Sequence, residues 1–228
     1  MSVQALLVRW ITPPVTLTMV EQALATVGTE EGFRWVDYRP IPADAQGRHA
    51  PRMAVASEDG WFWHHGGFDL GQMSYAIRDV LRGRDWRGAS TISQQVARNV
   101  FLWQGRNTLT RAVRKALEVP YTILLELFVP KERILELYLN IAEMGPLTFG
   151  IEAAAQRHFD KPAAELSPSE AARIIAILPA PRVWSVRGTE ANERLPDILA
   201  NRVPFPDDDG FEQMSDNAWD KVGWGSAF

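Results

Sequence analysis

Apolar positions along most of the chain recur at spacings of three and four, which is the pattern of amphipathic helices. In the segment 131–143, Ile134, Leu137, Tyr138 and Ile141 fall on one face of such a helix. The same period predicts further helices over residues 18–27, 53–56, 73–81, 90–102, 109–128, 151–158 and 169–178. The alternation typical of strands is scarce, and residues 28–50 have the composition of a loop. The pattern therefore predicts a mostly α-helical fold.

Prolines mark one helix boundary and disturb one helix interior. Ser167 is a capping residue, Pro168 occupies the first helical position and Glu170 the third, so a helix is expected to begin at Pro168. Pro120 falls inside the predicted helix 109–128, where it removes one backbone hydrogen bond. We therefore expect that helix to be kinked or split.

The composition describes one globular domain with a possible appendage at each end. The chain has 228 residues, 46% of them hydrophobic, and no cysteine, which excludes disulfides, thiolate zinc sites and a thiol nucleophile. It contains no run of about 18 apolar residues that would span a bilayer. The short apolar stretch 5–11 is compatible with the stub of a membrane anchor or with an ordinary N-terminal helix. The expected division is a stub over 1–12, the main domain over 13–186, and an acidic, weakly ordered tail over 187–228.

Charge is distributed unevenly along this chain of formal net charge -4. Nine basic residues face three acidic ones between Arg78 and Glu118, whereas nine acids face four bases from Arg187 onward. A local basic segment in an acidic protein favours a discrete anionic ligand such as phosphate over nucleic acid. Solvent-exposed helix faces are the alternative explanation.

Acids, histidines and aromatic residues are densest between residues 54 and 69. Glu58 follows an apolar helix and is crowded by aromatic rings, which suits a partly desolvated general base. The alternative is an exposed acid beside a core aromatic cluster. His64 and His65 are adjacent and so do not share a helix face. We expect one of them to be packed and the other exposed, rather than a metal site.

The segment 87–95 combines small residues with hydroxyl and amide side chains at the start of a predicted helix. Such a helix start can bind an anion, with arginines as countercharges, although a plain helix cap explains the hydroxyls equally well. Two adjacent glutamines would hydrogen-bond sugar or phosphate oxygens. The candidate residues are Arg87, Ser90, Thr91, Gln94, Gln95 and Arg98.

A second acid, Glu118, lies one turn after the basic pair Arg114 and Lys115. An exposed pair between Arg114 and Glu118 is the alternative explanation. Two carboxylates with a basic anion site suit transfer chemistry at a sugar carbon that carries a phosphate leaving group. One carboxylate activates the attacking hydroxyl, and the cations stabilise the leaving charge.

The order of these segments resembles the peptidoglycan glycosyltransferases of family 51, in particular the monofunctional biosynthetic form of Gram-negative bacteria. Five motifs carry the resemblance, over about residues 50–185. They are Glu58-Asp59-x-x-Phe62 with His65-x-Gly67-Phe68-Asp69; Arg87-Gly88-Ala89-Ser90-Thr91-Ile92-Ser93-Gln94-Gln95 with Asn99; Arg114-Lys115-x-x-Glu118; Lys131-x-x-Ile134-Leu135-Glu136-x-Tyr138-Leu139-Asn140; and Gly150-Ile151-Glu152-Ala153-Ala154-Ala155.

The resemblance implies a lysozyme-like helical domain with large and small lobes around a cleft. The implied reaction polymerises lipid II into β-1,4 glycan strands with inversion and releases undecaprenyl diphosphate. Glu58 would be the general base, and Glu118 would position basic groups or a divalent cation, Mg²⁺ or Mn²⁺, at the donor diphosphate. The implied substrate-binding residues are Ser90, Thr91, Gln94, Gln95, Arg98, Arg114, Lys115 and Lys131.

The resemblance also implies partners and a location. The partners would be lipid II, the nascent glycan strand and other cell-wall synthesis proteins, and no nucleic acid. The location would be the periplasmic face of the inner membrane, with the membrane anchor missing from this chain.

Two other functions remain open at this point. A lysozyme-like hydrolase or lytic transglycosylase would also use a carboxylate in a helical fold, but would not need a basic diphosphate site beside it. A non-catalytic scaffold for cell-wall enzymes is the third hypothesis. Transpeptidase activity and penicillin binding are not expected, because no lysine has a serine three residues before it.

Overall fold

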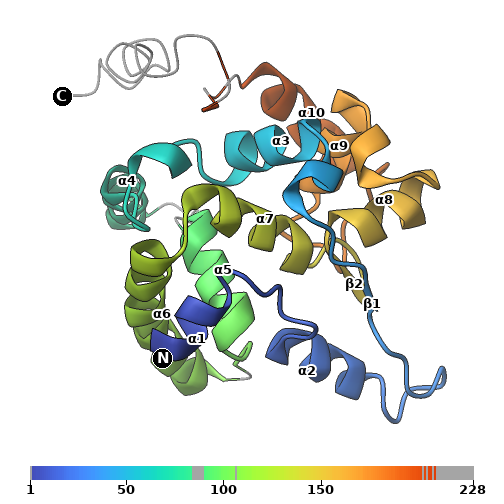
Figure 1. Ribbon diagram of the computed structural model, residues 1–228, viewed down its shortest axis with the longest axis horizontal. Coiled ribbons are helices and arrows are strands. Elements are labelled where there is room, and N and C mark those ends of the chain that lie inside the picture. Colours follow the sequence, from blue (N-terminus) through green and yellow to red (C-terminus); the bar gives the residue numbers. More distant parts are fainter. Residues whose placement is uncertain are drawn as a thin grey trace.

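The computed structural model describes residues 2–83, 90–105, 107–201, 203, 205, 206 and 208. Within these residues the protein is mostly α-helical, as predicted, and two groups of helices flank the central helix α7 (Figure 1). None of the described helices combines the length and the apolar character that crossing a bilayer requires.

Helix α7 (Lys131–Ile141) is the centre of the core. Its last turns are buried on every side, from Leu137 to Ile141, because α3, α5 and α8 all pack against it. The buried Asn140 donates its side-chain N–H to the carbonyl of Ile41 and accepts the N–H of the same residue, both at 2.9 Å. This pair of hydrogen bonds holds the segment before α3 against α7.

One group of helices packs around α9 (Pro168–Ala176). Its members are α3 (His49–Glu58), α8 (Ile151–Phe159) and α10 (Thr189–Ala200). The predicted start of α9 is confirmed: Ser167 Oγ accepts the N–H of Glu170, and Glu170 Oε2 accepts the N–H of Ser167 at 2.9 Å. Both bonds satisfy backbone donors that the first helical turn leaves without a partner.

Helix α10 corrects the expectation that the chain is weakly ordered from residue 187. It packs on α9 and α3, with Ala191 and Ile198 buried and Leu195 partly buried. These three positions form an apolar face that the acids and prolines of the segment obscured. Residues 209–228 of the expected tail lie outside the described residues.

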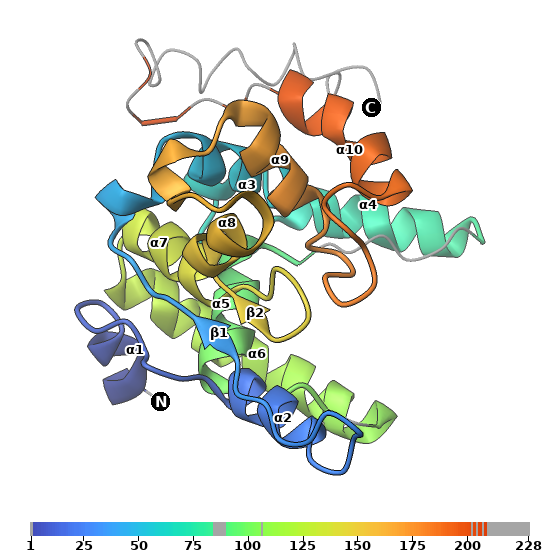
Figure 2. The ribbon, with the colours of Figure 1, turned by 90° about the vertical axis from the view of Figure 1, so that its right-hand side faces the viewer.

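The other group contains α1 (Ser2–Leu7), α2 (Leu17–Ala25), α5 (Ile92–Phe101) and α6 (Thr108–Phe128), and α4 (Leu70–Leu81) extends beside it (Figure 2). Helix α6 packs on α5 and α1, and α2 packs on α5. Of the two outcomes expected at Pro120, a kink or a split, the split is wrong, since α6 runs through Pro120 as one helix. A single missing N–H costs one hydrogen bond, and the packing of the following turn, where Thr122 and Leu125 are buried, holds the helix together.

The remaining elements of the described chain are two short strands and three 3-10 helices. In the segment 28–50, which was expected to be a loop, β1 (Asp37–Tyr38) pairs in parallel with β2 (Thr148–Phe149). Three short 3-10 helices complete the order: η1 (Ala43–Gln46), η2 (Phe62–His64) and η3 (Ala163–Glu165).

Candidate active site

Glu58 is the last residue of α3, and 14% of its side chain is exposed. Its Oε1 accepts the hydroxyl of Ser57 at 3.0 Å and lies 3.4 Å from Nη2 of Arg194 on α10. Because no hydrogen bond joins Oε2 to any of the described residues, one oxygen of this carboxylate remains available as a base.

The next residue, Asp59, joins the first two motifs. Its buried carboxylate accepts Nε2–H of His65 at 2.9 Å and the backbone N–H of Ile92, at the start of α5, at 2.9 Å. Nδ1 of His65 accepts the N–H of Gly67 at 3.0 Å, so the ring proton is on Nε2. These hydrogen bonds fix the end of α3 against the start of α5.

Thr91 and Gln94 cap α5. Thr91 Oγ1 accepts the N–H of Gln94 at 3.2 Å, and Gln94 Oε1 accepts the N–H of Thr91 at 3.0 Å. The Thr91 hydroxyl also donates to the carbonyl of Gly67 at 2.7 Å, and both side chains are buried. The helix-cap alternative therefore accounts for the Thr91 hydroxyl, and the same cap also engages Oε1 of Gln94.

Glu118 is buried in α6, with 1% of its side chain exposed, between two cations. Its Oε2 accepts Nζ–H of Lys115 at 2.8 Å, and its Oε1 lies 3.4 Å from Nε of Arg114. Lys115 also donates to the hydroxyl of Ser90 at 3.2 Å. A buried carboxylate needs such partners, because desolvation of an unpaired charge is costly. Glu118 thus forms ion pairs with two cations, of which Lys115 also contacts Ser90.

Lys131 lies in a second charged cluster. Its Nζ donates to Glu126 Oε1 at 2.8 Å and lies 4.4 Å from the centroid of the Phe62 ring. Glu126 also accepts the hydroxyl of Ser93. Burial lowers the pKa of Lys131, and the hydrogen bond to Glu126 acts in the opposite direction.

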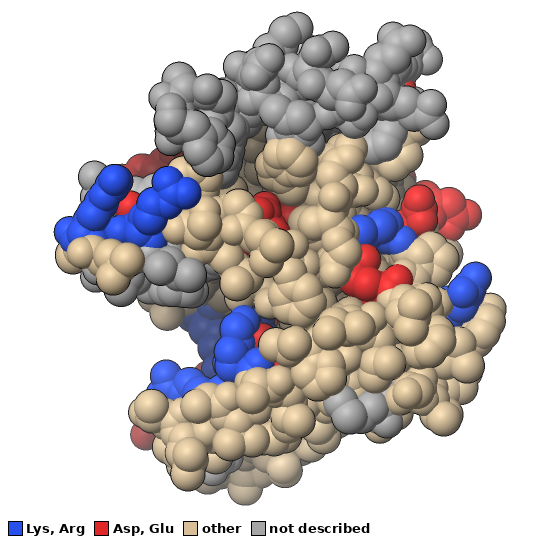
Figure 3. Space-filling model, turned by 90° about the vertical axis from the view of Figure 1, so that its left-hand side faces the viewer, with Lys and Arg blue, Asp and Glu red and all other residues tan. Residues whose placement is uncertain are grey.

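A cleft of about 710 Å³ separates the two groups of helices. Gln95, Arg98 and Arg114 line it, and so do further arginines and polar residues that sequence reasoning did not select. Figure 3 shows a deep recess on one face of the molecule, with Lys and Arg side chains on both sides of it. Among the lining residues outside the original selection are Glu21, Gln22, Arg111, Tyr138, Glu143 and Arg182.

Arg98 connects the two candidate acids electrostatically. Burial lowers the pKa of its guanidinium, while the charges of Glu118 and Glu58 both raise it. Tyr138 lies in the same environment: it is fully buried, its hydroxyl has no hydrogen-bond partner among the described residues, and burial raises its pKa well above the usual value. Glu58, Arg98 and Glu118 therefore form one electrostatic group, which the sequence had predicted only as separate motifs.

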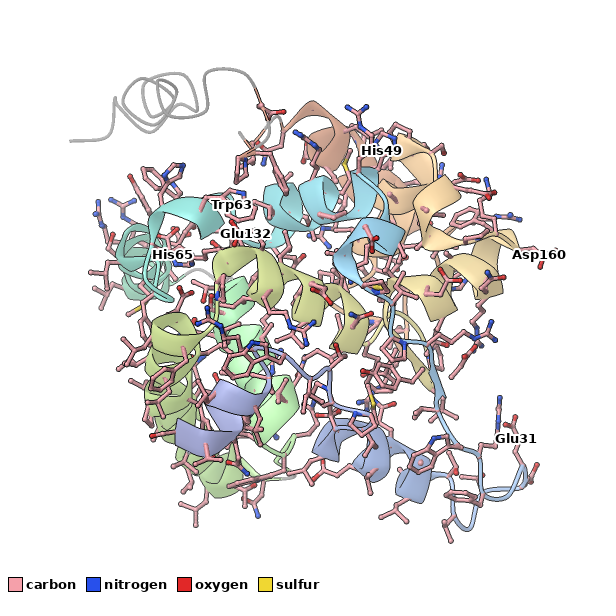
Figure 4. All side chains as sticks on the ribbon, in the orientation of Figure 1. Glu31, His49, Trp63, His65, Glu132 and Asp160 are labelled. Atoms are coloured by element: carbon pink, nitrogen blue, oxygen red, sulfur yellow. The ribbon has the colours of Figure 1, made fainter. Side chains whose placement is uncertain are left out.

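The environment of Glu118 does not match a protein metal site. Its neighbours are cations, and the described part of the chain contains no group of three or more His, Cys, Asp or Glu residues that could hold a metal ion. His65 is packed against Asp59 and His64 is exposed, as expected (Figure 4 labels His65 beside α4).

Arg87 and the glycine and alanine that follow it lie outside the described residues, so their predicted role at the start of α5 has no structural description. Sequence reasoning also missed Arg194 and Glu126. Arg194 lies in the segment that was expected to be weakly ordered, and no spacing connects it with Glu58.

These observations define a helical enzyme domain with a carboxylate at the end of one helix and a cation-lined cleft, whose Arg98 interacts electrostatically with that carboxylate. The sequence model of a family described as Transglycosylase matches residues 20–203. The chain therefore belongs to the transglycosylase family.

Curated relatives agree with this assignment. A biosynthetic peptidoglycan transglycosylase of Xanthomonas euvesicatoria pv. vesicatoria (strain 85-10) is 49% identical over 190 residues, which cover 81% of this chain and 73% of the relative. Proteins of the same name from Caulobacter vibrioides (strain ATCC 19089 / CIP 103742 / CB 15) and Ectopseudomonas mendocina (strain ymp) are 46% and 43% identical, over 81% and 84% of this chain and 76% and 78% of their own lengths.

Proposed function

We propose that this chain is a peptidoglycan glycosyltransferase that polymerises lipid II into β-1,4 glycan strands. In the proposed step, the 4-hydroxyl oxygen of the acceptor N-acetylglucosamine forms a bond to the anomeric carbon of the lipid-linked donor strand. The bond from that carbon to the diphosphate oxygen breaks with inversion, and undecaprenyl diphosphate leaves. The family membership and the names of the relatives support this reaction.

Glu58 is the proposed base. It would accept the proton of the attacking hydroxyl on Oε2, because Oε1 is held by Ser57 and Arg194. The carboxylate is mostly buried, and a cation, Arg194, lies beside it at the end of α3. General base catalysis of this kind contributes about 10² to 10⁴ in rate.

The cations of the cleft are the observation on which the proposal depends most, because they indicate that the leaving group is a diphosphate. Arg98, Arg111, Arg114 and Arg182 line one cavity, and Lys115 lies next to Arg114 on α6. Fixed cations stabilise charge that develops in the transition state, here on the departing diphosphate. We propose that Glu118 contributes by holding Arg114 and Lys115 in place.

No step of the proposed reaction passes through a metal ion. A divalent cation at the diphosphate would have to be held by Glu118 together with the phosphate oxygens of the substrate, since the described neighbours of Glu118 are cationic. Activity with and without a chelator tests this part of the proposal.

The proposed location is the periplasmic face of the inner membrane, with one face of α6 against the bilayer. The exposed residues of this face recur every three or four positions and carry no charge, and α1, which packs on α6, adds exposed Val3, Leu6 and Leu7. The surface below the recess in Figure 3 is likewise almost without charged side chains. The α6 face consists of Leu109, Ala112, Val113, Ala116, Val119, Ile123 and Leu127.

A hydrolase or lytic transglycosylase is less well supported. Cleavage of finished glycan strands releases no diphosphate, and so gives no use to the arginines gathered in the cleft. A scaffold without catalysis leaves the placement of Glu58 beside these cations without a function.

Lipid II and finished glycan strands, offered separately to the purified protein, test the proposal. We expect consumption of lipid II with formation of polymer, and a loss of about 10² or more in kcat for Glu58→Gln. Glu165→Gln is a matched control, because Glu165 is exposed on η3 away from the cleft. Consumption of strands but not of lipid II would overturn the proposal in favour of the hydrolase, and no turnover of either in favour of the scaffold.

A further inference from the structure

Arg194 joins three helices at the end of α3. From α10, its Nη1 donates to the carbonyl of Ala176, the last residue of α9, at 2.7 Å. Its Nη2 donates to Ser57 Oγ at 2.9 Å and lies 3.4 Å from Glu58 Oε1. The hydroxyl of Ser57 in turn donates to the same Oε1. One oxygen of Glu58 is thus held both directly and through Ser57.

Both charged partners are partly withdrawn from water. The exposed fractions of the side chains are 28% for Arg194 and 14% for Glu58, so solvent screens this pair less than a surface pair. Two further groups act on Glu58 from other helices: Arg98 of α5 and the buried phenol of Tyr138 of α7. Of these, Arg98 also interacts with Glu118, whereas the hydrogen bonds that Arg194 makes to described residues go to Glu58, its neighbour Ser57 and the carbonyl of Ala176.

We propose that Arg194 is a positioning residue for Glu58, a role that rests on the function proposed above. The hydrogen bonds of Arg194 and Ser57 on Oε1 fix the orientation of the carboxylate and direct Oε2 as the oxygen that receives the proton. Helix α10 therefore belongs to the catalytic unit.

Variants can separate this role from simple anchoring of α10. Arg194→Gln removes the charge and retains a hydrogen-bonding side chain, while Arg194→Lys retains the charge. Arg173→Gln is the matched control. From α9, Arg173 donates to the carbonyl of Val186 and, at 2.7 Å, to Oδ1 of Asn192 on α10. None of its hydrogen bonds to described residues reaches Glu58. The measurements are kcat and KM for lipid II, together with urea unfolding.

For Arg194→Gln we expect kcat at neutral pH to fall about tenfold while KM changes little, a smaller loss than the factor of about 10² to 10⁴ expected when the general base itself is removed. Arg194→Lys should restore part of kcat, and Arg173→Gln should leave kcat near the wild-type value. A loss of kcat in Arg194→Gln that matches the loss in Arg173→Gln would reduce Arg194 to an anchor of α10.

A readout that needs no turnover separates failure of this inference from failure of the proposed function. Carbon-13 NMR of the glutamate carboxyls at neutral pH, with the Glu58 signal assigned by its loss in Glu58→Gln, reports the hydrogen bonding of the Glu58 carboxylate directly. We expect the chemical shift of this signal to change in Arg194→Gln and to stay at the wild-type position in Arg173→Gln. If the wild type consumes lipid II and the signal does not move in Arg194→Gln, Arg194 does not act on Glu58. If the signal moves but no lipid II is consumed, the proposed function is wrong, and the catalytic role of Arg194 with it.

Discussion

The carboxylate Oδ2 of Asp59 accepts the backbone N–H of Ile92 at 2.9 Å, across 33 residues of sequence. This hydrogen bond ties the end of α3, which carries Glu58, to the start of α5, whose next turns carry Gln95 and Arg98. The same carboxylate holds His65. The candidate base and the cation-lined cleft are therefore positioned relative to each other through one buried side chain.

Asp59→Asn tests this connection. An asparagine oxygen at the Oδ2 position could still accept the N–H of Ile92 and of His65, but the NH₂ group at the Oδ1 position would place a donor 2.9 Å from the Nε2–H donor of His65, and the negative charge would be lost. We expect the free energy of unfolding to fall by about 1–3 kcal/mol, from one buried hydrogen bond to a charged group, and kcat to fall with it. Urea unfolding and lipid II turnover measure the two effects.

Asp69→Asn is the control for Asp59→Asn. Asp69 Oδ1 accepts the N–H of Gln72 near the start of α4, where asparagine caps about as well. Its stability should stay within about 0.5 kcal/mol of the wild type. Equal effects of the two substitutions would contradict a special role for Asp59.

Ile123→Asp tests the bilayer face of α6. The side chain of Ile123 is 52% exposed, so the folded protein should lose little stability, whereas a charge in the centre of the apolar face should weaken binding to lipid. In co-sedimentation with phospholipid vesicles, we expect the bound fraction of the variant to be at least about fivefold lower. A charge at an apolar lipid contact weakens the free energy of binding by about 1 kcal/mol or more. Leu199→Asp on α10 is the control, and equal losses in both variants would count against the α6 face.

Glu170→Gln tests a pH-dependent part of stability. Hydrogen bonds from the Ser167 backbone and from Lys161 lower the pKa of Glu170 from 4.5 to about 2. A lowered pKa means that this contribution is present above pH 4.5 and is lost as the pH falls toward 2. Because solvent reaches the pair of Glu170 and Lys161, we expect the free energies of unfolding of wild type and variant to differ by only about 1 kcal/mol at pH 7. Urea unfolding between pH 7 and pH 2.5 should show this difference shrinking below pH 4.5; a constant difference would contradict the assignment.

The helices with long apolar faces could be predicted from sequence because packing repeats their period over several turns. Lys131–Ile141 and the start of α9 at Pro168 are examples. The strands β1 and β2 could not, since two residues show no alternation. Helix α10 was not predicted, because its three apolar positions lie among acidic residues and prolines, a composition that is typical of weakly ordered segments.

The sequence indicated the individual residues of the site, but not the contacts that connect them. The residue types around Glu58, Arg98 and Glu118 indicated a base and a basic anion site, and the structure brings these three together. The sequence could not distinguish a helix cap from a ligand contact at Thr91 and Gln94, because the same side-chain atoms serve both. Arg194 is 136 residues from Glu58, a separation at which no local spacing rule applies.

The diameter of helix α6 also determines how far its cations lie from its uncharged face. Its uncharged exposed face and the side that carries Arg114 and Glu118 lie across the same helix, whose diameter with side chains is about 10 Å. If the uncharged face rests on the bilayer, the cations lie about one helix diameter above the lipid surface. A diphosphate joined directly to a lipid tail could then reach them without its tail leaving the membrane, so the thickness of a single helix would fix how far the substrate must rise.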